Sequence, residues 1–372
     1  MPIRSDFQLA REGVTVDTFT RLIRNTALNP ALTLPLLLLA RYTSPGLQLA
    51  GQHRTALTSV KALLALGALH RVGRWLDDKV LNNWSGNKKD DWDWSKEIVV
   101  VTGGADGIGK IVVQLFAERG IKVAVLDIQP LTYEPPPSVS YFHCNLADPK
   151  CIASTATEIK TTLGDPTVLI NNAGCVRGKS ILESSEFDIH LTFNVNTISH
   201  YLLTQQFLPS MIEKNHGMVV TVASLAGYVL APRMVDYAAS KAASVAFHEG
   251  LAAELSSLYN APNVRTVVMC QGYTRTALFD GFGATANTLY PETVAEEIVK
   301  AVYRGKSAHI VVPETAWMVA GVRGWPVSIQ YSVRKGLDGI MKNFKGRQVE
   351  VPSEMEGEGK EVGDSTVLVG GE

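Results

Sequence analysis

Between residues 98 and 313 the pattern of hydrophobic and polar residues alternates regularly between two kinds of segment. Short apolar runs rich in Val and Ile alternate with longer segments of helical spacing. Such runs are typical of parallel strands that are covered on both faces and therefore have few polar positions. The predicted strands are residues 98–102, 122–127, 139–144, 167–174, 218–224, 264–270 and 309–313. The clearest predicted helices between them are residues 108–119, 187–213, 236–258 and 293–303.

Strands that alternate with helices predict the fold class α/β. We expect a doubly wound, Rossmann-like sheet of seven parallel strands with helices on both faces. An apolar helical extension precedes it. The expected organisation is a membrane-associating extension and linker at 1–97, the α/β domain at 98–313, an apolar and basic segment at 314–349, and a disordered acidic tail at 350–372.

The extension contains two apolar runs, residues 30–41 and 62–69, with basic residues at their flanks. Each run is shorter than the roughly 20 residues that a spanning helix needs. Pro35 would break or kink a helix through the first run. The runs suit a hairpin or a position in the membrane interface, and all six tryptophans lie outside 98–313, as bilayer interfaces favour. The alternative is that both runs pack on the α/β domain or on a second subunit.

The composition argues against nucleic-acid binding and against a metal site. The net charge of the 372-residue chain is −1, so no global field attracts nucleic acid, and 46% hydrophobic residues favour membrane contact. The four cysteines show no metal-binding spacing and are expected to be reduced, and the eight histidines form no HExxH motif, so we expect no metal. Asp6, Glu12 and Asp17 interrupt the region where a cleaved signal peptide would have its apolar core.

A glycine-rich loop joins the first predicted strand to the first predicted helix. The sequence Thr102-Gly-Gly-Ala-Asp-Gly-Ile-Gly109 allows the backbone to approach a pyrophosphate at a helix N-terminus. A P-loop is the competing interpretation. It is disfavoured because Ile111, and not Ser or Thr, follows Lys110, which leaves no magnesium ligand.

An acidic residue ends the second predicted strand. Asp127 stands where a carboxylate would accept hydrogen bonds from the adenosine ribose, which favours NAD(H) and would repel a 2′-phosphate. Asp106 adds a second negative charge where an NADP site would need a cation. The expected cofactor is therefore NAD, with NADP as the alternative.

Three residues at and beyond the end of the fifth predicted strand, Ser224, Tyr237 and Lys241, suggest proton transfer. Ser224 ends that strand, and Tyr237 and Lys241 are four residues apart, on one face of a helix. A nearby ammonium can lower the pKa of a phenol from about 10 towards neutrality. A Tyr-x-x-x-Lys pair also occurs by chance on ordinary surface helices, so the pair alone is weak evidence.

These motifs occur in the order typical of the short-chain dehydrogenase/reductase family, which residues 98–313 resemble. The family's TGxxxGxG motif matches Thr102–Gly109, its NNAG motif matches Asn171–Gly174, and its active-site Ser, Tyr and Lys match Ser224, Tyr237 and Lys241. Its active-site Asn falls on Asn196, with Asn194 as a nearby rival. Two departures are Gln271 in place of Pro before Gly272, and Asn145 where Asp is common.

The resemblance implies roles for these residues. Tyr237 would be the general acid/base, Lys241 would lower its pKa and hold the nicotinamide ribose, Ser224 would polarise the substrate oxygen, and Asn196 would anchor a water. The implied cofactor-binding residues are Gly103, Asp106, Gly107, Ile108, Gly109, Asp127, Asn145, Leu146, Asn172, Ala173, Gly174, Tyr237, Lys241, Gly272, Thr274 and Thr276.

The apolar extension and the segments VASLAG and FHEGLAAEL are similar to the membrane- and lipid-droplet-associated retinol and 17β-hydroxysteroid dehydrogenases. This similarity implies a retinoid-, steroid- or long-chain-lipid-like alcohol or carbonyl substrate, a substrate lid at Ala277–Leu289, and a location on the cytosolic face of the endoplasmic reticulum or on lipid droplets. Members of the short-chain dehydrogenase/reductase family often form dimers or tetramers, so the family resemblance allows a homodimer or homotetramer. The alternatives are an NADPH-dependent retinal or 3-ketolipid reductase and a non-catalytic dinucleotide-binding scaffold on lipid droplets.

Overall fold

The computed structural model describes residues 3–4, 8–85, 92–283 and 288–348. The chain divides into two compact units, Phe7–Trp84 and a larger unit made of Met1–Asp6 and Ser85–Glu372. The predicted acidic tail at 350–372 lies outside the described residues, as do the middle of the predicted linker and residues 284–287 of the predicted lid.

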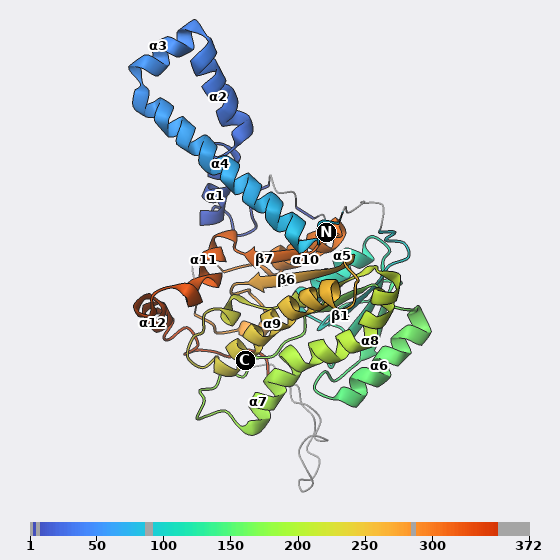
Figure 1. The fold of residues 1–372 in the computed structure, drawn as a ribbon. Helices are drawn as coiled ribbons and strands as arrows, with labels where there is room; N and C mark the ends of the chain where they lie inside the picture. The colour runs from blue at the N-terminus through green and yellow to red at the C-terminus, as the bar shows by residue number, and fades with distance from the viewer. Residues whose placement is uncertain (1–2, 5–7, 86–91, 284–287, 349–372) are drawn as a thin grey trace. The chain divides into compact units, whose positions relative to one another are not determined.

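The larger unit is built on one seven-stranded parallel sheet, as the sequence predicts (Figure 1). The strand order is β3-β2-β1-β4-β5-β6-β7. The strands are β1 (Ile98–Thr102), β2 (Lys122–Asp127), β3 (Val139–His143), β4 (Val168–Asn171), β5 (Gly217–Val222), β6 (Val264–Gln271) and β7 (Ala308–Val312). The order reverses between β1 and β4, and ligands of such sheets bind beyond the carboxyl ends of the strands at this point.

Helices cover both faces of the sheet, because successive strand residues point to opposite sides. Val99 and Val101 pack with α5 (Gly107–Ala117) and α10 (Pro291–Arg304), whereas Val100 packs in the core on the other face. The helices of that other face are α6 (Pro149–Leu163), α8 (Ser199–Lys214) and α9 (Val235–Ser257).

The helix boundaries depart from the sequence prediction in one functionally important place. The single helix predicted at 187–213 is three elements: α7 (Glu186–Phe193), the π-helical turn η2 (Asn194–Ile198) and α8. A π-turn leaves no mark on hydrophobic spacing, and such turns are frequent at functional sites. Short 3₁₀ turns elsewhere are η3 (Leu225–Gly227), η4 (Ala277–Phe279), η5 (Glu314–Ala316) and η6 (Val322–Gly324).

The tryptophans at the start of the larger unit contribute to its core. Trp92 and Trp94 stack with ring centroids 5.2 Å apart, and Trp94 meets Tyr303 of α10 edge-on at 4.8 Å. Both pack against the buried core cluster that covers this face of the sheet. The interpretation of all six tryptophans as interface residues is therefore wrong for these two, whose rings complete the cover of the sheet.

The N-terminal unit is entirely helical in its regular structure. Its helices are α1 (Val16–Asn25), α2 (Pro30–Tyr42), α3 (Ser44–Gln52) and α4 (Arg54–Leu81). α2 continues through Pro35, since a proline removes only one helical hydrogen bond. Arg71 of α4 donates to the Oδ1 atom of Asn29, the N-cap of α2, at 2.8 Å, which helps hold α2 and α4 together as two arms.

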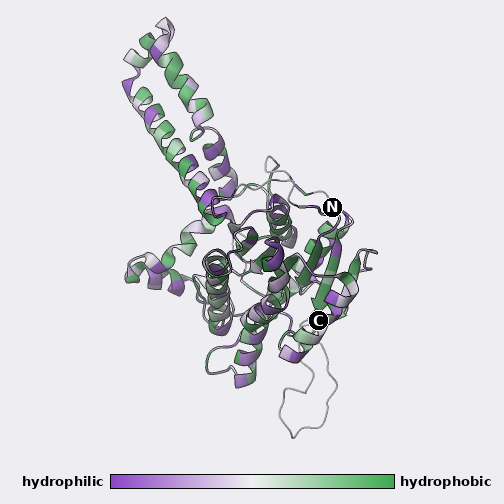
Figure 2. Ribbon diagram, turned by 45° about the vertical axis from the view of Figure 1, so that its right-hand side comes forward, coloured by the Kyte–Doolittle hydropathy of each residue, from purple (hydrophilic) through white to green (hydrophobic). Residues whose placement is uncertain are grey.

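Hydrophobic side chains remain exposed on this unit, and the ribbon in Figure 2 is coloured as hydrophobic at many positions of its helices. They include Phe19, Leu36, Leu39, Leu69 and Trp75, each at least half exposed. Within the described residues, no single helix combines the length and apolarity needed to cross a membrane. One pair, α1 and α2, meets both criteria together, with a bend of 44° between them.

Candidate active site

A cavity of about 550 Å³ lies at the carboxyl ends of the strands. Its wall includes residues within two positions of the ends of β1, β4, β5 and β6, namely Gly103, Asn172, Ser224 and Gly272. The predicted site residues on this wall are Gly103, Asp106, Gly107, Ile108, Asp127, Asn145, Leu146, Asn172, Ala173, Gly174, Ser224, Tyr237, Lys241, Gly272, Thr274 and Thr276. Two predicted residues, Gly109 and Asn196, are not part of it.

The glycine-rich loop is bound directly to the NNAG segment. The Thr102 hydroxyl accepts hydrogen bonds from the backbone N–H groups of Asn172 and Ala173, at 2.9 and 3.0 Å. The Asn172 side chain donates back to the carbonyl of Thr102 at 2.9 Å. Two motifs about 70 residues apart in sequence thus form one rigid floor of the cavity.

The loop fits the phosphates of a dinucleotide. Gly107 has φ +58°, and a Cβ atom there would meet nothing nearer than Thr276 Cγ2 at 3.7 Å, so the space beside the backbone is open. α5 begins at Gly107 and presents its N-terminal N–H groups on that side. These residues would hold the pyrophosphate of NAD(H) or NADP(H).

Asp127 is fixed in place by the backbone at the other end of the loop. Its two carboxylate oxygens accept from the backbone N–H groups of Ala105 and Gln129, at 2.9 and 3.0 Å. Burial raises the pKa of Asp127, while these hydrogen bonds and the charge of Arg347 oppose the rise. The carboxylate is therefore held rigidly where a ribose hydroxyl could donate to it.

The charge of Asp106 is balanced, contrary to the sequence interpretation. Arg347 Nη2 lies 2.6 Å from Asp106 Oδ2, and Arg347 Nη1 donates to Gln129 Oε1 at 3.3 Å. Burial acts to raise the pKa of Asp106, but hydrogen bonds from Gly107 and Arg347 lower it overall. The sequence analysis counted Asp106 as a negative charge where an NADP site would need a cation, and in the structure Arg347, 241 residues later in the chain, pairs with it.

The three residues for proton transfer converge from β5 and α9. The Ser224 hydroxyl accepts from the backbone of Ala226 at 3.1 Å and donates to the carbonyl of Gln271 at 3.4 Å. Lys241 Nζ donates to the carbonyl of Val222 at 2.8 Å. Tyr237 and Lys241 share one face of α9, and the Lys241 Nζ atom lies 5.8 Å from the centre of the Tyr237 ring.

Burial dominates the protonation of this group. It raises the pKa of Tyr237 above the ordinary value of 10.0, although a hydrogen bond with Ser224 works against the rise. Burial also lowers the pKa of Lys241 to about 8. Burial therefore opposes the lowering of the Tyr237 pKa that the sequence analysis expects from Lys241, and it favours the protonated phenol.

Asn196 supports the site from behind the cavity wall. It lies in the π-helical turn η2, and its side-chain amide bonds to both the N–H and the C=O of Cys175 and to Ser240 of α9. Asn194, the rival candidate, has no comparable contact in the described structure. The position of Asn196 depends on the π-turn, which the sequence prediction did not include.

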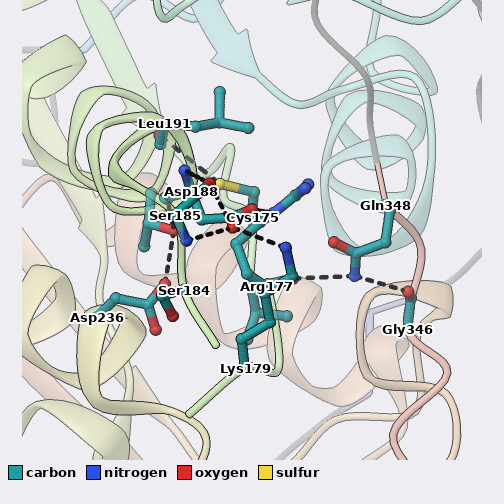
Figure 3. Close-up of polar contacts among 12 residues, drawn as sticks. Cys175, Arg177, Lys179, Ser184, Ser185, Asp188, Leu191, Asp236, Gly346 and Gln348 are labelled. Carbon is teal, nitrogen blue, oxygen red and sulfur yellow. Dashed lines mark hydrogen bonds and ion pairs between the residues drawn. The ribbon is translucent and has the colours of Figure 1, made fainter. Parts of the chain in front are cut away.

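A buried carboxylate that the sequence analysis missed holds the loop after β4 in place (Figure 3). Asp188 of α7 is paired with Arg177 at 2.6 Å and Lys179 at 2.7 Å, and it also accepts from Ser185. The two cations and Ser185 hold the pKa of Asp188 well below its usual range, although burial works against this. The loop that forms one side of the site is thereby anchored to α7.

The opposite side of the cavity is apolar. Phe279 of the predicted lid meets the Tyr237 ring edge-on, with centroids 5.5 Å apart, and Phe282 packs on Phe279. Residues from the C-terminal segment join them, a contribution that hydrophobic spacing could not reveal. The apolar residues of this wall are Leu225, Val229, Met234, Phe279, Phe282, Val319, Leu337 and Ile340.

Comparisons with known proteins identify the family of the chain. Residues 97–287 match the family model for short chain dehydrogenase. The chain is 44% identical over 232 residues to dehydrogenase RED2 of Cochliobolus heterostrophus, covering 60% of this chain and 86% of that protein. It is 32% identical over 239 residues to estradiol 17-beta-dehydrogenase 11 of Rattus norvegicus, covering 62% of this chain and 80% of the relative.

The fold matches solved structures as well. A short-chain dehydrogenase from Streptomyces avermitilis superimposes with a TM-score of 0.53 at 22% identity, over 66% of this chain and 96% of that one. The seven-stranded parallel sheet agrees with the family match. The chain belongs to the short-chain dehydrogenase/reductase family of NAD(P)-dependent oxidoreductases.

Proposed function

We propose that this enzyme is membrane-associated and transfers a hydride between NAD(H) and a lipophilic alcohol or carbonyl compound that resembles a retinoid, a steroid or a long-chain lipid. One observation carries the proposal. The polar group of Ser224 and Tyr237 shares a cavity with a wall of Phe, Leu, Val and Met side chains. Such a cavity suits a substrate with one oxygen on a large apolar body.

The chain's own residues handle the proton. A bound nicotinamide cofactor supplies or accepts the hydride. Ser224 Oγ orients the substrate oxygen, and Tyr237 Oη gives its proton to that oxygen during reduction or takes it back during oxidation. Lys241 Nζ, fixed on the carbonyl of Val222, stands behind Tyr237 as the next group that can exchange a proton. Asn196 holds the loop at Cys175, and a water at this place would join Lys241 to solvent.

Asp127 supports NAD(H) as the preferred cofactor. Its oxygens are fixed by Ala105 and Gln129 and would accept from ribose hydroxyls, whereas a 2′-phosphate would approach a carboxylate of the same sign. The competing proposal is an NADPH-dependent reductase of retinal or 3-ketolipids, and the Arg347 guanidinium beside Asp106 favours it.

The similarity to estradiol 17-beta-dehydrogenase 11 supports a lipophilic substrate. The exposed apolar side chains of α2 and α4, with nine Lys/Arg against three Asp/Glu in residues 1–76, support contact with a membrane or lipid-droplet surface. In the larger unit, α11 (Trp317–Ala320) exposes Trp317, and α12 (Val327–Gly336) exposes Tyr331 and also contains the basic Arg334 and Lys335.

The decisive experiment is NADH formation or consumption by detergent-solubilised full-length protein with retinoids, steroids and long-chain alcohols and ketones. Tyr237→Phe keeps the ring but removes the hydroxyl group that carries the transferred proton. We expect at least about a 10²-fold loss of kcat with NADH binding retained. Tyr228→Phe is the matched control. Activity that survives Tyr237→Phe would refute the assignment, and NADH binding without turnover of any substrate would favour the scaffold.

The membrane setting is tested separately. Residues 1–76 fused to a fluorescent reporter should localise to membranes or lipid droplets. A companion fusion with Leu36→Asp and Leu39→Asp, two exposed positions of α2, should lose that localisation. A reporter that stays diffuse without these substitutions would contradict membrane association by this unit.

A further inference from the structure

The end of the described chain, residues 337–348, lines the cavity with Leu337, Ile340 and Arg347 and is here named the C-terminal strap; its first half consists of turns. Its backbone bonds to the lid at three points: Gly283 N–H to Ile340 C=O, Lys345 N–H to Asp280 C=O, and Arg347 N–H to Ala277 C=O, each at 2.8 Å. The two backbones lie so close that a Cβ atom at Gly281 would collide with the carbonyl of Asn343.

The strap is also attached on the other side of the cavity. Gln348 donates to the carbonyl of Val176 at 3.2 Å, in the loop that Asp188 holds (Figure 3). Met341 of the strap is buried in the same cluster as Val176 and Tyr237. These contacts fix the backbone on both sides of Arg347 and direct its side chain towards the glycine-rich loop.

Arg347 therefore ends at the adenosine end of the cofactor cavity. Its two terminal nitrogens bond to Asp106 of the loop and to Gln129, two residues after Asp127. Its Nε atom is buried and has no hydrogen-bond partner among the described residues. A guanidinium with a spare donor, beside the carboxylate that would bind the ribose, is the arrangement that accommodates a 2′-phosphate.

We propose that Arg347 is a cofactor-binding residue that gives this enzyme affinity for the 2′-phosphate of NADP(H), and that Asp106 limits this affinity by competing for the guanidinium. The inference rests on the proposed function to the extent that the cavity binds a nicotinamide dinucleotide. NAD(H) leaves the Arg347–Asp106 ion pair intact. NADP(H) exchanges the Asp106 carboxylate for a phosphate on the same guanidinium. The balance between the two cofactors is thus set by a residue outside the nucleotide-binding motifs.

Titrations of the full-length protein with NADH and NADPH test this without substrate, using energy transfer from tryptophan to the bound nicotinamide. Asp106→Asn should lower the Kd for NADPH by about tenfold, and Arg347→Met should raise it by about tenfold. Either change should alter the Kd for NADH by less than about threefold. The double variant with both Asp106→Asn and Arg347→Met should lose the tighter NADPH binding of the Asp106→Asn variant. Lys345→Met, which removes an exposed charge from the same strap, should leave both Kd values unchanged.

Arg347→Lys retains the charge but not the forked geometry, so it should keep part of the NADPH affinity even if Arg347→Met disturbs the strap. The inference is overturned if the gain in Asp106→Asn persists without Arg347, or if the Arg347 variants weaken NADH and NADPH equally. Failure of the wild type to bind either dinucleotide would instead refute the proposed function.

Discussion

Asn196 and Cys175 exchange two hydrogen bonds between a side chain and a backbone. The Cys175 N–H donates to Asn196 Oδ1 at 2.8 Å, and Asn196 Nδ2 donates to the Cys175 carbonyl at 2.9 Å and to Ser240 Oγ at 3.0 Å. One amide therefore joins the loop after β4 to η2 and α9. The site's geometry depends on this junction, since Ser240 lies directly before Lys241.

Asn196→Ala should lower both stability and kcat. Two backbone groups and one hydroxyl lose a buried partner, which costs about 2–3 kcal/mol in unfolding free energy. The loop should then move relative to Lys241, and kcat should fall more than the KM for the cofactor rises. Urea unfolding and steady-state kinetics measure both effects. Asn194→Ala, two residues earlier in the π-turn, is the control, and an equal loss there would contradict the assignment to Asn196.

Lys241→Met should stabilise the protein while abolishing turnover. The pKa of Lys241 is lowered from 10.5 to about 8, so below pH 8 the folded state bears a cost of about 3 kcal/mol for a buried charge. The unfolded chain holds more protons between pH 8 and 10.5, and wild-type stability should therefore rise with pH in that window.

Urea unfolding of Lys241→Met should show a gain of about 1–3 kcal/mol at pH 7 and a smaller gain at pH 10. The lost hydrogen bond to the Val222 carbonyl keeps the gain below the full cost. Lys214→Met removes a half-exposed lysine and should change stability by less than about 0.5 kcal/mol. A destabilised Lys241→Met at neutral pH would show that the charge is not costly.

Asp188→Ala should be strongly destabilising, because Arg177 and Lys179 would lose the buried carboxylate between them. Removing one partner of such a group costs about 3–5 kcal/mol. Glu183→Ala breaks the half-exposed pair with Arg233 at 3.4 Å and should cost less than about 1 kcal/mol. Thermal and urea unfolding compare the two directly. Similar losses would indicate that the Asp188 cluster is no stronger than a surface pair.

His200 should make the protein sensitive to acid. Burial and the nearby Lys241 charge lower its pKa from 6.5 to about 3, so the folded state keeps the ring neutral. The unfolded chain binds more protons than the folded protein between pH 6.5 and 3. This residue should therefore lower the free energy of unfolding by about 1.4 kcal/mol for each unit by which the pH is lowered in that window. His200→Leu should flatten the slope between pH 6 and 4. His190→Leu, which alters an exposed ring, should not.

The strands and the motif residues could be predicted because local patterns determine them. Val99 and Val101 face one core and Val100 the other, an alternation inside an apolar run that only a doubly covered strand shows. The turn η2 was missed because it changes the hydrogen bonding and not the hydrophobic spacing. Trp92 and Trp94 were assigned to the membrane because composition cannot distinguish a lipid surface from the partners that bury a ring.

The sequence by itself determined the α/β class and predicted the glycine-rich loop and the group of Ser224, Tyr237 and Lys241, since these depend on short-range spacing. Only the tertiary structure decided which distant residues complete the site. Arg347 meets Asp106 across 241 residues, and the strap closes on a lid about 65 residues before it. Such contacts depend on how the packed helices and strands bring distant segments together. The basic character of residues 314–349 does not by itself reveal which arginine will reach a carboxylate.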